Sequence, residues 1–131
     1  MLLREINRAL DWPRLEAFWR QKGLPRVDLR ALPPTGLVAC REDGALLAAA
    51  FLVKSDTNMA SLAFVCGNPA TPREERSEAL DAVILSLAEI ALRAGFSCIG
   101  AASNVLALQA RYERLGFKLT DENVRCYGGF L

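Results

Sequence analysis

The sequence contains no histidine at any of its 131 positions. This absence excludes the Ser-His and Cys-His pairs that activate a nucleophile, because both need an imidazole as the general base. It also removes the side chain that most often binds zinc and other transition metals. Any proton transfer must therefore use a carboxylate, a tyrosine, a thiol, a lysine, the backbone or water, and we expect no metal cofactor.

Long hydrophobic runs and an excess of one charge are also missing. The longest clearly apolar run, residues 45–53, is about half of the roughly 20 residues that a membrane-spanning helix needs. Arg4 and Glu5 interrupt the first six residues, which therefore do not form a secretion signal. Sixteen basic and fifteen acidic side chains leave a net charge of +1, so no general field attracts nucleic acid or an anionic membrane. We expect a cytoplasmic protein that binds neither.

The four cysteines lie far apart and include no C-x-x-C pair. Each falls in a segment with the pattern of a strand: Cys40, Cys66, Cys98 and Cys126. Without an export signal, this spacing indicates neither a disulfide framework nor a zinc site. We expect buried free thiols that pack like small hydrophobic side chains.

Length and composition indicate one globular domain over residues 1–131. With 52% hydrophobic and 24% charged residues, a chain of this size can bury one core without disulfides. Four apolar segments in the first half predict strands, at residues 2–6, 36–41, 45–54 and 60–66. The step Asp43-Gly44 is typical of a hairpin turn, so the last three of these strands should form an antiparallel meander.

Two long helices are predicted, over residues 11–23 and 71–95. Asp11 is expected to cap the first, which carries a proline in its first turn and ends at a glycine. In the second, Thr71 and Glu74 fit a capping box, in which the two side chains bond to one another's backbone N–H groups. Apolar residues then recur with helical spacing until a glycine ends the element.

Three further strands should complete the sheet. The strand at residues 96–102 follows the long helix, and a crossover of this kind makes it the parallel neighbour of the strand at 60–66. The other two, at residues 117–120 and 124–130, flank a polar turn. Together with the meander, these segments indicate one α/β layer architecture.

A short helix over residues 103–116 carries the most informative side chain, Tyr112. Ser103 or Asn104 can cap its start, and Gly116 supplies the left-handed residue that ends it. A tyrosine near the end of a buried helix, beside a strand that could line a cleft, is a candidate proton donor. A ring packed in the core with its hydroxyl satisfied is the other interpretation, and the sequence leaves both open.

This order of elements resembles the GNAT N-acetyltransferase superfamily over nearly the whole chain. The likeness rests on the segment Y-E-R-L-G-F at residues 112–117, on the hairpin turn at 42–44 and on the step Asn68-Pro69. The resemblance implies an α/β (α+β) fold, with a mixed, mostly antiparallel sheet of about six to seven strands flanked by about three to four helices. Two parallel strands of this sheet should splay apart.

The resemblance also implies that an acetyl group passes from acetyl-coenzyme A to a small amine or a protein amino group. The pantetheine arm would bond to free backbone groups near Val65, Cys66 and Gly67. Backbone N–H groups at the end of that strand would stabilise the oxyanion, and Tyr112 would protonate the departing thiolate. Asn104 would correspond to the asparagine that contacts the cofactor in the family.

The segment that should hold the pyrophosphate departs from the family pattern. Members normally carry R/Q-x-x-G-x-G/A at the start of the long helix, whereas residues 72–77 read P-R-E-E-R-S, without either glycine. A capping box at Thr71 would satisfy the N–H groups of the helix end internally, and the neighbouring glutamates would weaken its positive potential. Arg73 and Arg76 could compensate as phosphate ligands, beside Ser77.

Two further positions leave questions open. Asn104 precedes Tyr112 by eight residues where the family has seven, and one residue turns a side chain by about 100° around a helix. A role as a helix cap alone therefore stays open for Asn104. The strand at 60–66 offers no carboxylate as general base, and Glu42 and Asp56 lie in turns, so we expect deprotonation through water or an amine of low pKa.

Two functions of different classes follow. The first is an acetyl-coenzyme A-dependent N-acetyltransferase. The second is a catalytically silent domain of the same fold that serves as a binding or regulatory module, through a sheet edge or as a homodimer. The lost glycines and added glutamates of residues 68–77 favour the silent interpretation, because they weaken the expected anion site.

Overall fold

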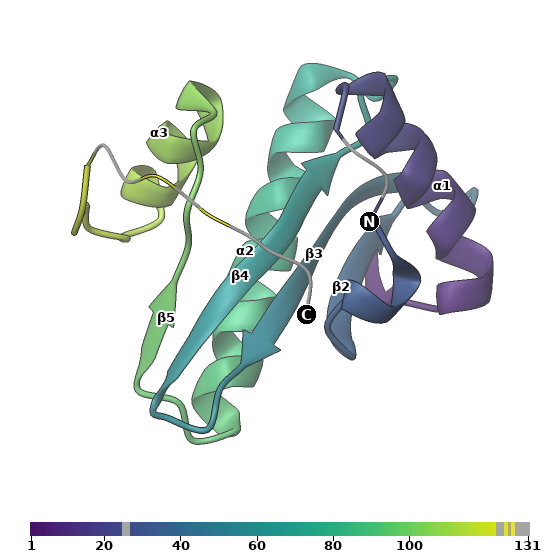
Figure 1. Ribbon diagram of the computed structural model, residues 1–131. Coiled ribbons are helices and arrows are strands. Elements are labelled where there is room, and N and C mark those ends of the chain that lie inside the picture. Colours follow the sequence, from purple (N-terminus) through teal and green to yellow (C-terminus); the bar gives the residue numbers. More distant parts are fainter. Residues whose placement is uncertain (25–26, 123–124, 126, 128–131) are drawn as a thin grey trace.

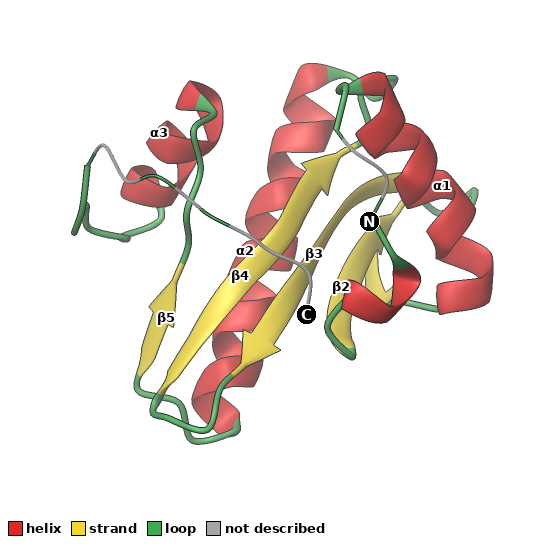
Figure 2. Ribbon diagram, in the orientation of Figure 1, coloured by secondary structure: helices red, strands yellow, loops and turns green. Residues whose placement is uncertain are grey.

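The computed structural model describes residues 1–24, 27–122, 125 and 127. Within these residues, five strands form one sheet in the order β1-β2-β3-β4-β5, and helices cover both of its faces (Figures 1 and 2). The elements follow in chain order: β1 (Leu2–Glu5), α1 (Arg8–Gln21), the 3-10 turn η1 (Leu29–Ala31), β2 (Thr35–Cys40), β3 (Leu46–Lys54), β4 (Met59–Gly67), α2 (Arg73–Arg93), β5 (Cys98–Gly100) and α3 (Leu106–Arg114).

The sheet is mixed and mostly antiparallel, as predicted. The first three pairings, β1 with β2, β2 with β3 and β3 with β4, are antiparallel. Only β4 and β5 run parallel, because α2 carries the chain across one face between them. Among the described helices, none is long and apolar enough to cross a membrane.

Two hydrophobic clusters, one on each face of the sheet, form the core. The cluster against α2 includes Val83, Ile84 and Leu87, and also receives Tyr112 from α3. The cluster on the opposite face includes Leu15 and Trp19 of α1. Since β3 is buried on both faces, it is apolar along most of its length, which explains why no alternation of polar residues marks it in the sequence.

Helix α1 begins earlier than the sequence indicated, and the predicted cap is wrong. Asn7 is the N-cap, since its side chain accepts a hydrogen bond from the N–H of Leu10. Asp11 is instead fully buried, where its carboxylate accepts from the Asn7 N–H and from the guanidinium of Arg4. A carboxylate with an arginine partner within reach is more stable in this pair than as an exposed cap.

The predicted capping box at the start of α2 is also wrong. Pro72 is the N-cap, its carbonyl accepts from the N–H of Arg76, and no side chain bonds to the first N–H groups of the helix. Thr71 is buried and belongs to the preceding turn, in which its N–H bonds to the carbonyl of Asn68. The first turn of α2 therefore keeps its N–H groups for another partner.

The end of the chain departs most from the prediction. The strand expected at 96–102 is shorter, and residues 117–120 form no strand, because no described strand lies beside them to accept a ladder of hydrogen bonds. Most of the strand expected at 124–130 lies outside the described residues. The described sheet thus has five strands where the resemblance implied about six to seven.

Helix α3 also begins without either predicted cap. Val105 is the N-cap and makes no side-chain bond to the helix. Ser103 accepts from the N–H of Val105 and so stabilises the turn before the helix, whereas Asn104 is exposed. The predicted end is confirmed, since Gly116 has a φ of 100°, a left-handed conformation that favours glycine.

Candidate active site

The parallel pair at the centre of the candidate site separates soon after it begins. Met59, Ala60 and Ser61 pair with the three residues of β5, and β4 then continues through Gly67 with no described strand on that side. Figure 1 shows the two strands diverging toward the end at which α2 and α3 begin. Residues 62–67 therefore present backbone groups to which an extended ligand could bond as an additional strand.

A β-bulge bends β4 within this unpaired stretch. On the neighbouring strand β3, Ala49 pairs with Cys66 and Phe51 pairs with Ala63, so two residues of β4 stand opposite one of β3. The first of the two is Phe64. Among the described residues other than glycine, it alone has a positive φ, of 51°. This conformation costs on the order of 1–2 kcal/mol for an L-residue with a side chain.

Aromatic packing holds the bulge in place. The ring of Phe64 lies 5.7 Å from that of Trp19 and 6.0 Å from that of Phe51, between α1 and the sheet. Such aromatic contacts are worth about 0.5–1.5 kcal/mol each beyond the area that they bury, enough to offset the backbone strain. The sequence did not predict this residue, because both faces of β4 are apolar and a shift in alternation leaves no trace.

The start of α2 is a better anion site than its sequence suggests. Its first N–H groups have no side-chain cap, and a helix N-terminus carries a partial positive charge. Glu75 forms an ion pair with Arg41 at the end of β2, and this hydrogen bond lowers the pKa of the carboxyl group. The neighbouring arginine thus offsets one of the two acidic charges that opposed phosphate binding in the sequence.

The side chains that were predicted to bind phosphate lie at this helix end, but they differ in their contacts. Arg73 is exposed at the first helical position. Arg76 packs over Gly67, where an added Cβ would lie 2.7 Å from its side-chain carbons, and its Nη1 lies 3.2 Å from the carbonyl of Thr71. Ser77 accepts a hydrogen bond from Arg111 of α3. Arg76 and Ser77 are therefore already engaged within the protein, whereas Arg73 is accessible.

Tyr112 is buried on the α2 side of the sheet, with 7% of its surface exposed. Its ring lies 5.3 Å from that of Phe117, and burial raises the pKa of its hydroxyl to about 12. No described residue forms a hydrogen bond with that hydroxyl. Tyr112 is thus both a core ring and a phenol that keeps its proton at neutral pH.

The thiol of β4 is not a nucleophile in this environment. Cys40 and Cys66 are buried and free, as predicted. Burial raises the pKa of the Cys66 thiol to about 11, despite a hydrogen bond from Trp19. A thiol with such a pKa contains almost no thiolate at neutral pH. Cys98 is exposed, contrary to the prediction, because it opens the short edge strand β5, and Cys126 lies outside the described residues.

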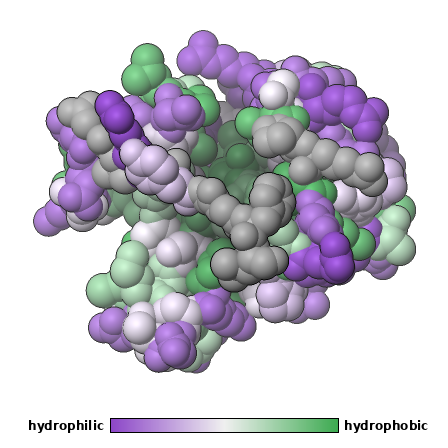
Figure 3. Space-filling view, in the orientation of Figure 1, coloured by the Kyte–Doolittle hydropathy of each residue, from purple (hydrophilic) through white to green (hydrophobic). Residues whose placement is uncertain are grey.

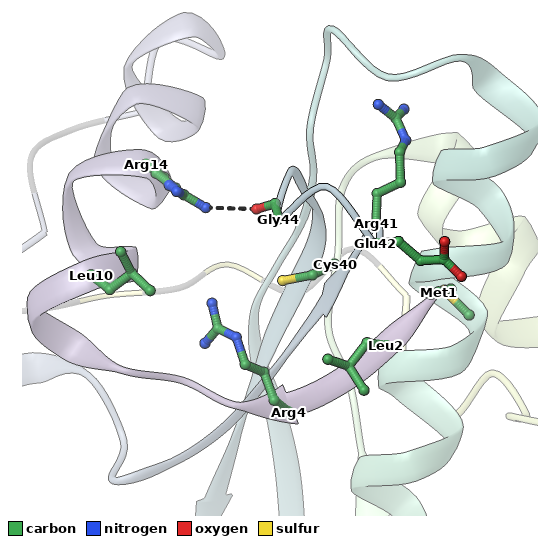
Figure 4. A pocket seen from close by; sticks show the side chains of 9 residues that line it. All are labelled: Met1, Leu2, Arg4, Leu10, Arg14, Cys40, Arg41, Glu42 and Gly44. Carbon is green, nitrogen blue, oxygen red and sulfur yellow. Dashed lines mark hydrogen bonds between the residues drawn. The ribbon is translucent and has the colours of Figure 1, made fainter.

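Two hollows lie near the turn that joins β2 and β3. One, of about 610 Å³, is lined by Arg4, Arg14 and Arg41 (Figure 4). All three have protein partners, since Arg14 donates to the carbonyl of Gly44 and the other two bond to carboxylates. The other, of about 520 Å³, lies beside Asn68. Because β1 and β5 are at opposite edges of the sheet, the first is separate from the opening beside β4.

The face drawn in Figure 3 has a hollow near its centre, with apolar side chains on its floor. An apolar floor of this kind suits the uncharged arm of a cofactor. The described residues therefore combine two features of a ligand site, an unpaired strand edge and an uncapped helix end.

No protein-family model matches this sequence, and no curated protein matches it. Solved structures do match the fold. An Agrobacterium tumefaciens protein described as an acetyltransferase has a TM-score of 0.74 at 20% identity, over 98% of this chain and 100% of that one. Glucosamine-6-phosphate N-acetyltransferase from Arabidopsis thaliana has a TM-score of 0.71 at 10% identity, over 96% and 97%. A Mycobacterium tuberculosis protein in complex with coenzyme A has a TM-score of 0.70 at 15% identity, over 86% of this chain and 70% of that one.

These structures define the class of the fold. The element order, the crossover between the parallel strands and the matches over nearly the full length agree, and the chain has the fold of the GNAT superfamily. At identities of 20% or less the likeness concerns the fold, and the chemistry must be argued from the site.

Proposed function

We propose that this protein is an acetyl-coenzyme A-dependent N-acetyltransferase that acts on a small amine or a protein amino group. The observation that carries the proposal is the unpaired stretch of β4, with its strained bulge at Phe64. Strain at such a position persists where the surrounding structure holds it, and it is concentrated at binding and catalytic sites. One acetyltransferase domain over residues 1–131 and a cytoplasmic location stay predictions.

The residues present fit the cofactor at both of its ends. Backbone groups of Val65, Cys66 and Gly67 would bond to the pantetheine arm, and the N–H groups at the start of α2 would bond to the pyrophosphate, with Arg73 beside them. When bound, acetyl-coenzyme A supplies an activated acetyl group as a thioester. Arg76 could add its charge by leaving the loop carbonyls that it now contacts.

Two groups of this chain would then assist the transfer. A backbone N–H beside the bulge would stabilise the oxyanion that forms when the amine attacks. Tyr112 would hold a proton at its hydroxyl and donate it to the departing thiolate, for which its raised pKa keeps it protonated. No described carboxylate stands in β4, so water or an amine of low pKa remains our expectation for the deprotonation step.

The silent binding module is the second candidate, favoured by one observation. Arg76 lies over Gly67 and bonds to the loop carbonyls, in the region where the pantetheine arm and pyrophosphate would meet. If this contact persists, the coenzyme cannot bind there. Ligand binding therefore discriminates between the two functions before any assay of turnover.

Thermal unfolding with and without 1 mM acetyl-coenzyme A tests the proposal. With a dissociation constant near 10 μM, a hundredfold excess adds about 2.7 kcal/mol to the free energy of unfolding, which raises the Tm by several degrees. Acetate and adenosine 5′-monophosphate at the same concentration are the controls. Absence of a shift contradicts the enzyme. If a shift is seen, mass spectrometry of a panel of amines after incubation must show acetylation, since binding without it supports the silent module.

A further inference from the structure

A cluster of arginines joins α2 to α3 close to the uncapped helix end. Nη1 of Arg111 donates to the carbonyl and the hydroxyl of Ser77, at 3.0 and 3.1 Å, and to Asp81 at 2.5 Å. Arg114 donates to both oxygens of the same carboxylate, at 2.9 and 3.0 Å. Two guanidinium groups therefore share one carboxylate, and the cluster keeps one uncompensated positive charge.

Of the two arginines that share this carboxylate, Arg111 is the less exposed to water. Arg114 already contacts both oxygens of Asp81, and its side chain is 55% exposed, so water screens most of its own charge. The side chain of Arg111 is only 14% exposed, and its three bonds use a single nitrogen. Within the described chain, Nη2 and Nε of Arg111 donate to no acceptor. A partly buried guanidinium with one free edge is suited to bidentate contact with a phosphate.

We infer that Arg111 binds the 3′-phosphate of coenzyme A, an inference that rests on the proposed function. The α-helical rise places Ser77 about 6 Å along α2 from Arg73 at the pyrophosphate site. One ribose separates the diphosphate of coenzyme A from its 3′-phosphate, a span of the same order. Two hydrogen bonds fix Arg111 at Ser77, and therefore at this distance along α2 from Arg73.

Asp81 has a positioning role in this site. Burial disfavours its charge, but the hydrogen bonds from Arg114 and Arg111 outweigh that effect and lower the pKa of the carboxyl group. It therefore stays ionised at neutral pH and orients both arginines. Because two guanidinium groups share this one carboxylate, an incoming phosphate meets a net positive charge rather than an acidic one.

Paired affinity measurements with coenzyme A and 3′-dephospho-coenzyme A test the inference. The wild-type protein should bind coenzyme A about ten to a hundred times more tightly, the usual worth of a charge-assisted contact to phosphate. Arg111→Gln should remove most of this preference and leave the affinity for the dephospho form within about twofold. Arg111→Lys should keep part of it, and Arg93→Gln, an exposed arginine at the far end of α2, should keep all of it.

The outcomes separate this inference from the proposed function. Equal affinity of the wild-type protein for the two ligands overturns the assignment of Arg111 and leaves the acetyltransferase proposal intact. Equal weakening of both ligands by Arg111→Gln means that the residue only holds α3 in place, and also overturns it. Failure of both ligands to bind the wild-type protein contradicts the proposed function itself.

Discussion

At the scale of single residues, Tyr112 carries the chemistry that we propose. Tyr112→Phe removes one oxygen and keeps the ring against Phe117, so the fold should be unchanged. We expect kcat to fall by about 10² to 10⁴ while the Tm shift with acetyl-coenzyme A persists. Because the pKa of Tyr112 is about 12, the wild-type rate should show no alkaline loss from this group below about pH 11. Unchanged turnover in the variant would make the tyrosine purely structural.

Arg4 and Asp11 are the residues whose pairing the sequence concealed. Asp11 is fully buried, and Arg4→Met would remove the guanidinium that bonds to its carboxylate, at a cost of about 3 kcal/mol near neutral pH. Urea unfolding curves give this difference. Arg93→Met is the matched control, since it breaks only an exposed pair with Glu89 and should cost under about 0.5 kcal/mol.

The contribution of Asp11 to the stability of the Arg4→Met variant should depend on pH with the opposite sign to its contribution in the wild type. In the wild type, burial disfavours the charge of Asp11, but Arg4 and the Asn7 N–H lower its pKa below the ordinary 3.8. Its contribution to stability is therefore fully present above that value and is lost as the pH falls through the folded pKa. In the variant, burial is no longer opposed by Arg4, so the pKa of Asp11 should rise and the stability deficit should shrink as the pH falls from 7 toward 4. A constant deficit would contradict this account.

At the scale of elements, the bulge in β4 makes a prediction with two matched substitutions. Phe64→Ala and Phe64→Gly both remove the ring, but only glycine adopts a φ of 51° without strain. The glycine variant should therefore be more stable than the alanine variant by about 1 kcal/mol in urea unfolding. At the neighbouring Ala63, Ala63→Gly should instead destabilise by about 0.5–1 kcal/mol. Greater stability of the alanine variant at position 64 would show that the bulge is not strained.

At the scale of the whole molecule, thiol labelling reports how the core opens. In a Cys126→Ser background, Cys98 should react rapidly with a disulfide reagent, because it is exposed. Cys40 and Cys66 lie in the core between α1 and the sheet and should react only at the rate of global unfolding. Adding Cys98→Ser should abolish the rapid phase. Rapid labelling of Cys66 would mean that α1 separates from the sheet without global unfolding.

Much of the element order was predictable, because apolar periodicity and glycine positions are local signals. The meander, the long helix and the parallel crossover are where residues 36–66 and 71–102 indicated them. The caps were predicted less well. Asp11 and Thr71 have the right side chains to begin a helix, but each is buried in another role. A cap depends on one hydrogen bond, and tertiary contacts of similar energy decide it.

The sequence by itself determined the class of fold and the exclusion of histidine chemistry, since both follow from patterns along the chain. Only the tertiary structure decided the character of the site. The bulge at Phe64, the ion pair that offsets Glu75 and the free edge of Arg111 depend on contacts between residues far apart in the sequence. Such contacts arise when the elements pack together, and no local pattern encodes which side chains will then meet.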